Sequence, residues 1–268
     1  MLLPLHNEPR DYAWGSTSLL ARLHGREPTG LPEAEVWFGD HPADPAVTAD
    51  GRTLDVWLAE ESAQRSRLPY LLKLLAAGSP LSIQAHPSKP QAQLGFAREE
   101  AAGTPRDAPE RTYRDDNHKP ELLVAISDRF RALAGLRGLA ATRRLVRELG
   151  PGAHALRDRL EDGSTGLNDR EGELSLSLAG VIGWLHSADA SVDVHNIITA
   201  ASSTNSEEFS AELDLVRHLA ELYPGDPGIV IAMLMNLVTL RRGEGLFIPA
   251  GVLHAYVEGL GVELMASS

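Results

Sequence analysis

Three polar side chains, Ser82, Gln84 and His86, alternate with apolar ones in the segment 81–87. Successive side chains of a β-strand point to opposite faces, so a strand here would place all three on one face. The apolar run 68–75 just upstream favours burial, and buried polar groups need hydrogen-bond partners or a metal ion. Gln84 and His86 could therefore bind one ion together, although a hydrogen-bonded core histidine is the commoner use of such a position.

A second histidine follows a turn near the end of the chain. After Gly243, the residues Pro249, Gly251 and His254 follow with five, one and two residues between them. Short strands separated by glycine and proline turns are typical of small barrels and jelly rolls. We therefore expect His254 in the mouth of such a barrel, either as a metal ligand or as a structural residue beside the turn.

Lysine is rare in this chain. It occurs only at Lys73, Lys89 and Lys119, whereas arginine supplies the rest of the 25 basic residues. All three lysines lie in the part of the chain that holds the polar stripe. A lysine ammonium is a compact, flexible positive charge that suits a phosphate or an enolate oxygen. The clustering favours an anionic substrate, unless it is a chance result of an arginine-rich composition.

The composition limits the class of protein. The 268 residues are enough for one large or two ordinary domains. A net charge of -12 disfavours binding to nucleic acid or to anionic membranes. The absence of cysteine excludes disulfides and thiolate metal ligands. No apolar run reaches membrane-spanning length and the N-terminus lacks a signal-peptide pattern, so we expect a cytoplasmic protein.

The sequence pattern changes from strands to helices and back to strands. Strands are expected at 33–40, 68–75, 81–86, 122–126, 229–240, 246–248, 254–256 and 262–265. In the first of them, Val36 and Phe38 should point inward. Residues 259–261 should form a turn before the last one. Helices are expected at 16–25, 53–59, 88–102, 139–149 and 206–223, and in part of 160–184. The helix at 88–102 should begin with a capping box formed by Ser88 and Gln91. This order predicts a mainly β protein with an α-helical insertion. We divide it into an N-terminal metal-binding domain (1–138), a helical insertion (139–226) and C-terminal strands (227–268).

Four motifs together resemble the type I mannose-6-phosphate isomerase family of the cupin superfamily. They are Leu-Ser-Ile-Gln-Ala-His-Pro (81–87), Asn-His-Lys-Pro-Glu (117–121), Pro-Ala-Gly-Val-Leu-His-Ala-Tyr (249–256) and Gly-Val-Glu-Leu-Met-Ala-Ser-Ser (261–268). The segments 12–16 and 33–37 are similar to the N-terminal part of that family. The resemblance implies two cupin-like jelly-roll domains, and an aldose–ketose isomerase that interconverts mannose 6-phosphate and fructose 6-phosphate through an enediol.

The resemblance also implies the roles of individual residues. One zinc ion (Zn2+) per chain would be bound by Gln84, His86, Glu121 and His254. Lys119 would stabilise negative charge that develops on the substrate, while Tyr256 and Glu263 would handle protons. Ser82 and Lys73 lie on or next to the polar stripe, and we expect them to contact the phosphosugar substrate. We expect a monomer with no nucleic-acid or membrane partner.

The resemblance ends at Ser268, where the family continues into an aspartate and then an arginine regarded as catalytic. Their absence from the 268 residues predicts an incomplete second cupin-like domain, an open sheet edge and impaired activity. Two alternative functions therefore remain. One is a protein that binds metal or sugar phosphate without turnover, and the other is a cupin oxygenase with iron bound by His86, Glu121 and His254.

Overall fold

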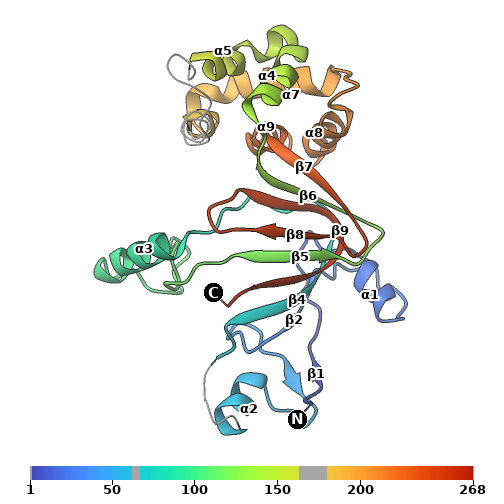
Figure 1. Cartoon of the computed structure of the whole chain (residues 1–268), viewed down its shortest axis with the longest axis vertical. Coiled ribbons are helices and arrows are strands. Elements are labelled where there is room, and N and C mark those ends of the chain that lie inside the picture. Colours follow the sequence, from blue (N-terminus) through green and yellow to red (C-terminus); the bar gives the residue numbers. More distant parts are fainter. Residues whose placement is uncertain (1, 62–66, 163–179, 268) are drawn as a thin grey trace. The chain divides into compact units, whose positions relative to one another are not determined.

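The structure is a computed structural model that describes residues 2–61, 67–162 and 180–267. It combines a large antiparallel sheet with a helical segment (Figure 1). The chain divides into two compact units, one made of Met1–Ala132 and Val238–Ser268 and the other of Leu133–Leu237. In sequence, the helical unit is therefore inserted between the two parts of the sheet unit. Its bounds extend beyond the expected 139 and 226 because it also includes parts of two strands and an additional helix.

The sheet is organised around its last strand, β9 (His254–Ala266). This strand lies between β4 (Tyr70–Ala77) and β5 (Glu121–Ala125) and is antiparallel to both (Figure 1). On the outer side of β4 lies β2 (Glu35–Phe38), and on the outer side of β5 lies β8 (Gly245–Ile248). Strand β6 (Arg129–Leu136) pairs both with β9 and with β7 (Met235–Arg241). Segment 227–268 was expected to form strands of a second domain. Its strands β8 and β9 instead complete the sheet begun by the N-terminal segment.

Strand β9 is continuous, although its two glycines predicted a turn at 259–261. Gly259 has φ +126°, and a Cβ atom there would lie 2.7 Å from a ring carbon of Phe130. A Cβ atom on Gly261 would lie 3.1 Å from the carbonyl oxygen of Val124. The glycines therefore allow β9 to bend against its neighbours while its pairing with β4 and β5 continues.

The register of the sheet gathers polar side chains on one face. Glu263 of β9 lies opposite Lys73 of β4, and Lys73 lies opposite Trp37 of β2. The neighbouring row contains Phe38, Leu72, Leu122 and Leu264, which point to the other face. Val36 is buried as expected, but Glu35 and Trp37 on the opposite face of β2 are buried too, at 6% and 8% exposed. Both faces of β2 are covered, since helix α1 (Leu19–Leu23) packs on the face that contains Val36.

The segment around Gln84 is not a β-strand, contrary to expectation. Gln84 forms an isolated bridge in which it exchanges two backbone hydrogen bonds of 2.8 Å with His254. Pro80 and Pro87 flank the segment, and neither can donate a hydrogen bond to a longer ladder. The polar stripe is not enclosed either, because Ser82 and Gln84 are exposed and only His86 is partly buried.

Two further helices and a pair of short strands complete the sheet unit. Helix α3 (Lys89–Ala101) begins with the predicted capping box, in which the backbone N–H of Ser88 donates to Oε1 of Gln91 over 2.9 Å. Helix α2 (Leu54–Glu61) matches the expected helix at 53–59. Strands β1 (Leu5–His6) and β3 (Val47–Thr48) form a separate two-stranded sheet.

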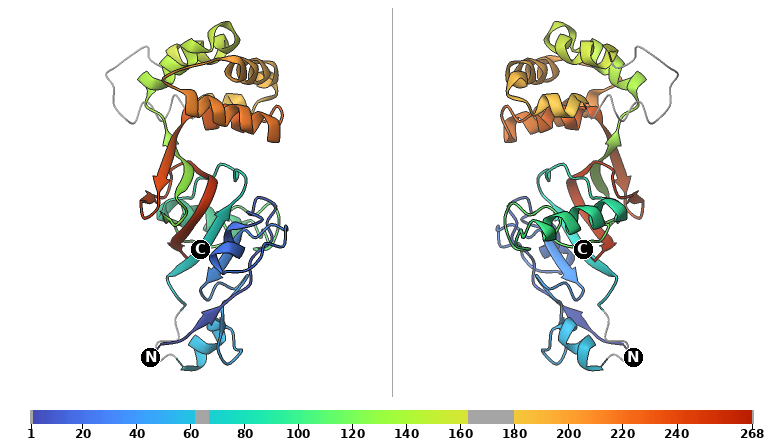
Figure 2. Two further views of the ribbon diagram at one scale, coloured as in Figure 1. Left: turned by 90° about the vertical axis from the view of Figure 1, so that its right-hand side faces the viewer. Right: turned by 90° about the vertical axis from the view of Figure 1, so that its left-hand side faces the viewer.

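The second unit is a group of short helices (Figure 2). They are α4 (Leu139–Glu148), α5 (His154–Asp162), α7 (Ser191–Ser203), α8 (Ser210–Leu222) and α9 (Gly228–Leu234), with 3-10 turns at Gly150–Ala153 and Ala188–Ala190. The apolar periodicity predicted α4 and α8 correctly, although α8 begins four residues later than 206. The part of the expected helical region at 163–179 lies outside the described residues.

Helix α9 overturns the prediction of one long strand at 229–240. All residues from Ile229 to Leu234 are buried, so all of them are apolar. The alternation of apolar and polar residues that marks an exposed helix is therefore absent from this part of the sequence. The strand β7 begins only at Met235. Among the described helices, none combines the length and apolar character that crossing a bilayer requires.

Candidate metal centre

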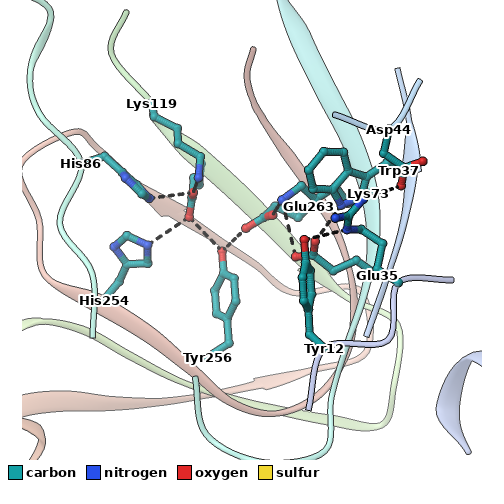
Figure 3. A network of polar contacts seen from close by, with 12 residues as sticks. Tyr12, Glu35, Trp37, Asp44, Lys73, His86, Lys119, His254, Tyr256 and Glu263 are labelled. Atoms are coloured by element: carbon teal, nitrogen blue, oxygen red, sulfur yellow. Dashed lines mark hydrogen bonds and ion pairs between the residues drawn. The ribbon is translucent and has the colours of Figure 1, made fainter. Parts of the chain in front are cut away.

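His86, Glu121 and His254 meet at one point in the sheet unit. Nε2 of His86 lies 3.1 Å from Oε1 of Glu121, and Nε2 of His254 lies 3.1 Å from Oε2 of the same carboxylate (Figure 3). One ligand atom from each of the three residues lies within 4.8 Å of the others. Two imidazoles and a carboxylate at this spacing could hold a metal ion.

Secondary structure fixes two of these three residues. Glu121 is the first residue of β5 and directly follows Pro120, which stands at the strand start as its missing N–H requires. His254 is the first residue of β9, and its Nδ1 lies 3.1 Å from the carbonyl oxygen of Val252. A carbonyl oxygen only accepts, so Nδ1 carries the proton. In the neutral imidazole, Nε2 then presents its lone pair toward Glu121.

His86 provides the clearest sign that these residues suit a metal ion. Its Nε2 is buried and has no hydrogen-bond partner in the described part of the chain. It lies 3.1 Å from Oε1 of Glu121, but the two groups are not aligned for a hydrogen bond. Buried polar atoms are nearly always partnered, and a nitrogen lone pair beside a carboxylate oxygen fits a shared metal ion. The residues present therefore suit a metal.

The electrostatics keep Glu121 ionised. Burial raises the pKa of Glu121, but the adjacent imidazoles of His254 and His86, together with the ammonium of Lys119, outweigh it and hold that pKa well below its usual range. The ammonium of Lys119 lies 3.2 Å from Oε1 of Glu121. Burial lowers the pKa of His254, yet the contact with Glu121 raises it above its ordinary value overall. A metal ligand must be deprotonated, and Glu121 meets this requirement at neutral pH.

A buried polar network continues from the centre across the sheet (Figure 3). The hydroxyl of Tyr256 lies 3.4 Å from Oε2 of Glu121 and donates to Oε1 of Glu263 over 2.7 Å. The ammonium of Lys73 lies 3.5 Å from Oε2 of Glu263 and also 3.5 Å from Oε1 of Glu35. The network thus links β5, β9, β4 and β2 through a continuous series of polar contacts.

Burial sets the proton affinities of this network. It raises the pKa of Glu263 above the ordinary value, and Lys73 only partly opposes this effect. It also raises the pKa of Tyr256, with Glu263 and Glu121 acting in the same direction, so Tyr256 remains a protonated donor at neutral pH. Burial lowers the pKa of Lys73, but Glu263 and Glu35 raise it overall, and the ammonium remains charged.

The structure brings most of the expected site residues together. His86, Lys119, Glu121, His254, Tyr256, Glu263 and Lys73 belong to the metal centre or to the network beside it. Gln84 and Ser82 are exposed, with the Gln84 amide nitrogen 3.5 Å from Oγ of Ser82. Lys89 lies elsewhere, at the start of α3, with its ammonium 3.3 Å from Oδ1 of Asn117.

Sequence reasoning missed Glu35 and Trp37. The indole Nε1 of Trp37 donates to Oε2 of Glu35 over 2.7 Å, and both side chains are buried. The available signal was their spacing, since residues two apart on a strand share a face. The apolar Val36 and Phe38 suggested the opposite face, and only the packing of helix α1 explains why both faces are buried.

Comparison with known proteins identifies the family. The model of "Phosphomannose isomerase type I, catalytic domain" matches residues 2–139. The mannose-6-phosphate isomerase of Escherichia coli (strain K12) is 36% identical over 282 residues, which cover 98% of this chain and 68% of that protein. The human mannose-6-phosphate isomerase is 33% identical over 299 residues, which cover 100% of this chain and 67% of that protein.

Solved structures agree with the sequence comparison. A zinc-bound crystal structure of mannose 6-phosphate isomerase matches 99% of this chain and 68% of its own, with a TM-score of 0.82 and 33% identity. The apo form from Salmonella typhimurium matches the same shares of both chains with a TM-score of 0.84 and 32% identity. The chain therefore belongs to the type I phosphomannose isomerase family.

Proposed function

We propose that this chain is a zinc-dependent aldose–ketose isomerase that interconverts mannose 6-phosphate and fructose 6-phosphate. The observation that carries the proposal is the cluster of His86, Glu121 and His254. Among the described residues, a buried nitrogen of His86 has no partner except the carboxylate of Glu121 beside it. Relatives that match nearly the whole chain are mannose-6-phosphate isomerases, and one matching structure of that enzyme contains zinc. We therefore propose that the substrate is a phosphosugar.

One zinc ion per chain would be held by these three residues and by Gln84. The backbone of Gln84 exchanges both hydrogen bonds with His254, and directly opposed residues in such a pair share a face. The side chain of Gln84 therefore lies on the same side as that of His254. Nitrogen and oxygen ligands suit zinc, which at a catalytic site keeps a position for substrate or water. Bound there, zinc would supply Lewis acidity toward the sugar oxygens.

The neighbouring residues can manage the proton that must leave carbon 2 and arrive at carbon 1. Glu263 has a raised pKa, which makes it a stronger base than an exposed carboxylate. Tyr256 remains protonated and donates to Glu263, so this pair can hold a proton close to the metal centre. The ammonium of Lys119 stands beside the centre and would stabilise negative charge on the enediolate oxygens.

The two residues expected to contact substrate differ in exposure. Ser82 is exposed next to Gln84, which suits a direct contact of its hydroxyl with the sugar. Lys73 is buried between two carboxylates, so we propose that its charge acts on the substrate site through Glu263. We also propose that the sheet unit is of the cupin type and that the helical unit is an insertion within it.

The proposal is tested by incubating the zinc-loaded chain with mannose 6-phosphate and measuring fructose 6-phosphate. We expect turnover with mannose 6-phosphate and little with unphosphorylated mannose. Tight binding of mannose 6-phosphate without turnover would show a binding protein instead. Oxygen consumption by an iron-loaded sample would support the cupin oxygenase.

A further inference from the structure

We propose that Glu35 is a positioning residue that holds the Lys73 ammonium midway between its own carboxylate and that of Glu263. Its catalytic consequence rests on the function proposed above, but the contact itself can be tested without turnover. Glu35 lies on β2, two strands away from Glu263 on β9. It would act through Lys73 and would not touch the substrate.

Lys73 is shared equally between two carboxylates. Its ammonium lies 3.5 Å from Oε1 of Glu35 and 3.5 Å from Oε2 of Glu263. The side chains of Lys73, Glu35 and Glu263 are 9%, 8% and 3% exposed. In the described residues, no other lysine or arginine forms an ion pair with either carboxylate. Because water screens these charges poorly, the position of Lys73 depends on both partners.

Glu35 is itself fixed at its second oxygen. Oε2 accepts the 2.7 Å hydrogen bond from the indole of Trp37, which leaves Oε1 for Lys73. The ammonium of Lys73 also lies 4.8 Å from the centroid of the Trp37 ring, within the range of a cation–π contact. Two independent contacts from β2 thus determine where the ammonium lies.

The arrangement has a consequence for Glu263. Its Oε1 accepts from Tyr256, and its Oε2 faces Lys73. If Glu35 loses its charge, Glu263 is the one carboxylate among the described residues that still forms an ion pair with Lys73, and the ammonium would move toward it. The carboxylate would then be neutralised more strongly and turned away from its contact with Tyr256. Glu35 would therefore affect the rate of the reaction more than the affinity for substrate.

The chain has only three lysines, which allows a direct test. In a zinc-loaded sample with 15N-labelled lysine side chains, the signal of the buried Lys73 ammonium is assigned by its loss in Lys73→Met. We expect Glu35→Gln to shift or broaden this signal, because the amide keeps the size of the side chain but not its charge. Glu33→Gln is the matched control, since Glu33 pairs with Arg26 in an exposed contact and should leave the signal unchanged.

Kinetics supply the second readout. We expect Glu35→Gln to lower kcat about tenfold or more while KM changes less than about threefold and zinc content stays the same. An unchanged Lys73 signal, or a loss confined to KM, would overturn the positioning role. If the wild-type chain has no isomerase activity, the proposed function fails, while the ammonium signal still decides the contact. If Glu35→Gln does not fold, Trp37→Phe replaces it, and the same shift of the Lys73 signal is expected.

Discussion

The hydroxyl of Tyr256 donates a 2.7 Å hydrogen bond to Glu263, which lies seven residues further along the same strand. In a straight strand, seven residues span about 23 Å, which is farther than these two side chains can reach together. The contact therefore requires β9 to bend between them, where Gly259 and Gly261 lie. Through this bend, one strand supplies a metal ligand at its start and the proposed proton-handling pair further along.

Gly259→Ala should damage both the fold and the centre. The new Cβ atom would lie 2.7 Å from the ring of Phe130 and 2.9 Å from backbone atoms, at φ +126°, where side chains are strained. We expect a loss of about 2 kcal/mol or more in the free energy of unfolding, measured by urea denaturation, together with weaker zinc binding. The control is Gly183→Ala, in a helical turn where nothing lies within 4 Å of the new Cβ atom. It should be neutral or slightly stabilising, and an equal loss in both variants would refute the role of the bend.

Lys119→Met should reduce the rate of isomerisation. It removes the ammonium that lies 3.2 Å from Glu121 and that would stabilise the enediolate. We expect kcat to fall about 100-fold, with a smaller change in KM, in a steady-state assay. Lys89→Met removes the same charge at the start of α3, where Lys89 contacts Asn117 and Asp116, and should retain most of the activity. An equal loss of activity in the two variants would mean that removing any positive charge has this effect, and would contradict a specific role of Lys119.

Gln84→Ala should weaken zinc binding if Gln84 is the fourth ligand. The exposed side chain contributes little to packing, so the free energy of unfolding of the zinc-free protein should change by less than about 0.5 kcal/mol. We expect the dissociation constant for zinc, measured by competition with a chelating dye, to rise about tenfold. Gln93→Ala, an exposed glutamine on α3, is the control. An unchanged zinc affinity would point to a three-residue site, as the oxygenase alternative requires.

Glu263 should make the stability of the metal-free protein depend on pH. Burial raises the pKa of Glu263 in the folded state above its ordinary value of 4.5. Above pH 4.5 and up to the raised pKa, the folded state therefore binds more protons than the unfolded state, and stability falls as pH rises. Glu263→Gln lacks this contribution.

The measurement is urea denaturation of both proteins in chelator between pH of about 4.5 and 8. The free energy of unfolding of the wild type relative to Glu263→Gln should decrease as pH rises and then level off. A difference that stays constant, or that increases with pH, would mean that the pKa of Glu263 is not raised.

Local patterns in the sequence predicted much of the fold. The capping box placed the start of α3 at Ser88, and apolar periodicity placed α4 and most of α8. These signals depend on neighbouring residues in the chain, so they can be read without the tertiary structure. The prediction failed at Ile229–Leu234, because burial on all sides removes the period that separates helix from strand.

The site was predictable to a similar extent. The motifs identified His86, Glu121 and His254 through their resemblance to a family, and the structure places them together. The burial expected for Ser82 and Gln84 was wrong, because the upstream apolar run forms β4 and does not enclose them. The ion pair of Glu35 was missed because its partner Lys73 lies on another strand, and sheet register is not encoded in local spacing.

The central claim is tested most directly by following mannose 6-phosphate conversion by the 268-residue chain with zinc, after chelation, and after zinc is restored. We predict turnover that chelation abolishes and zinc restores, and no turnover in Glu121→Gln under any of these conditions. Conversion that persists without metal, or a sample with one zinc per chain and no conversion at all, would contradict the assignment of this chain as a zinc-dependent isomerase.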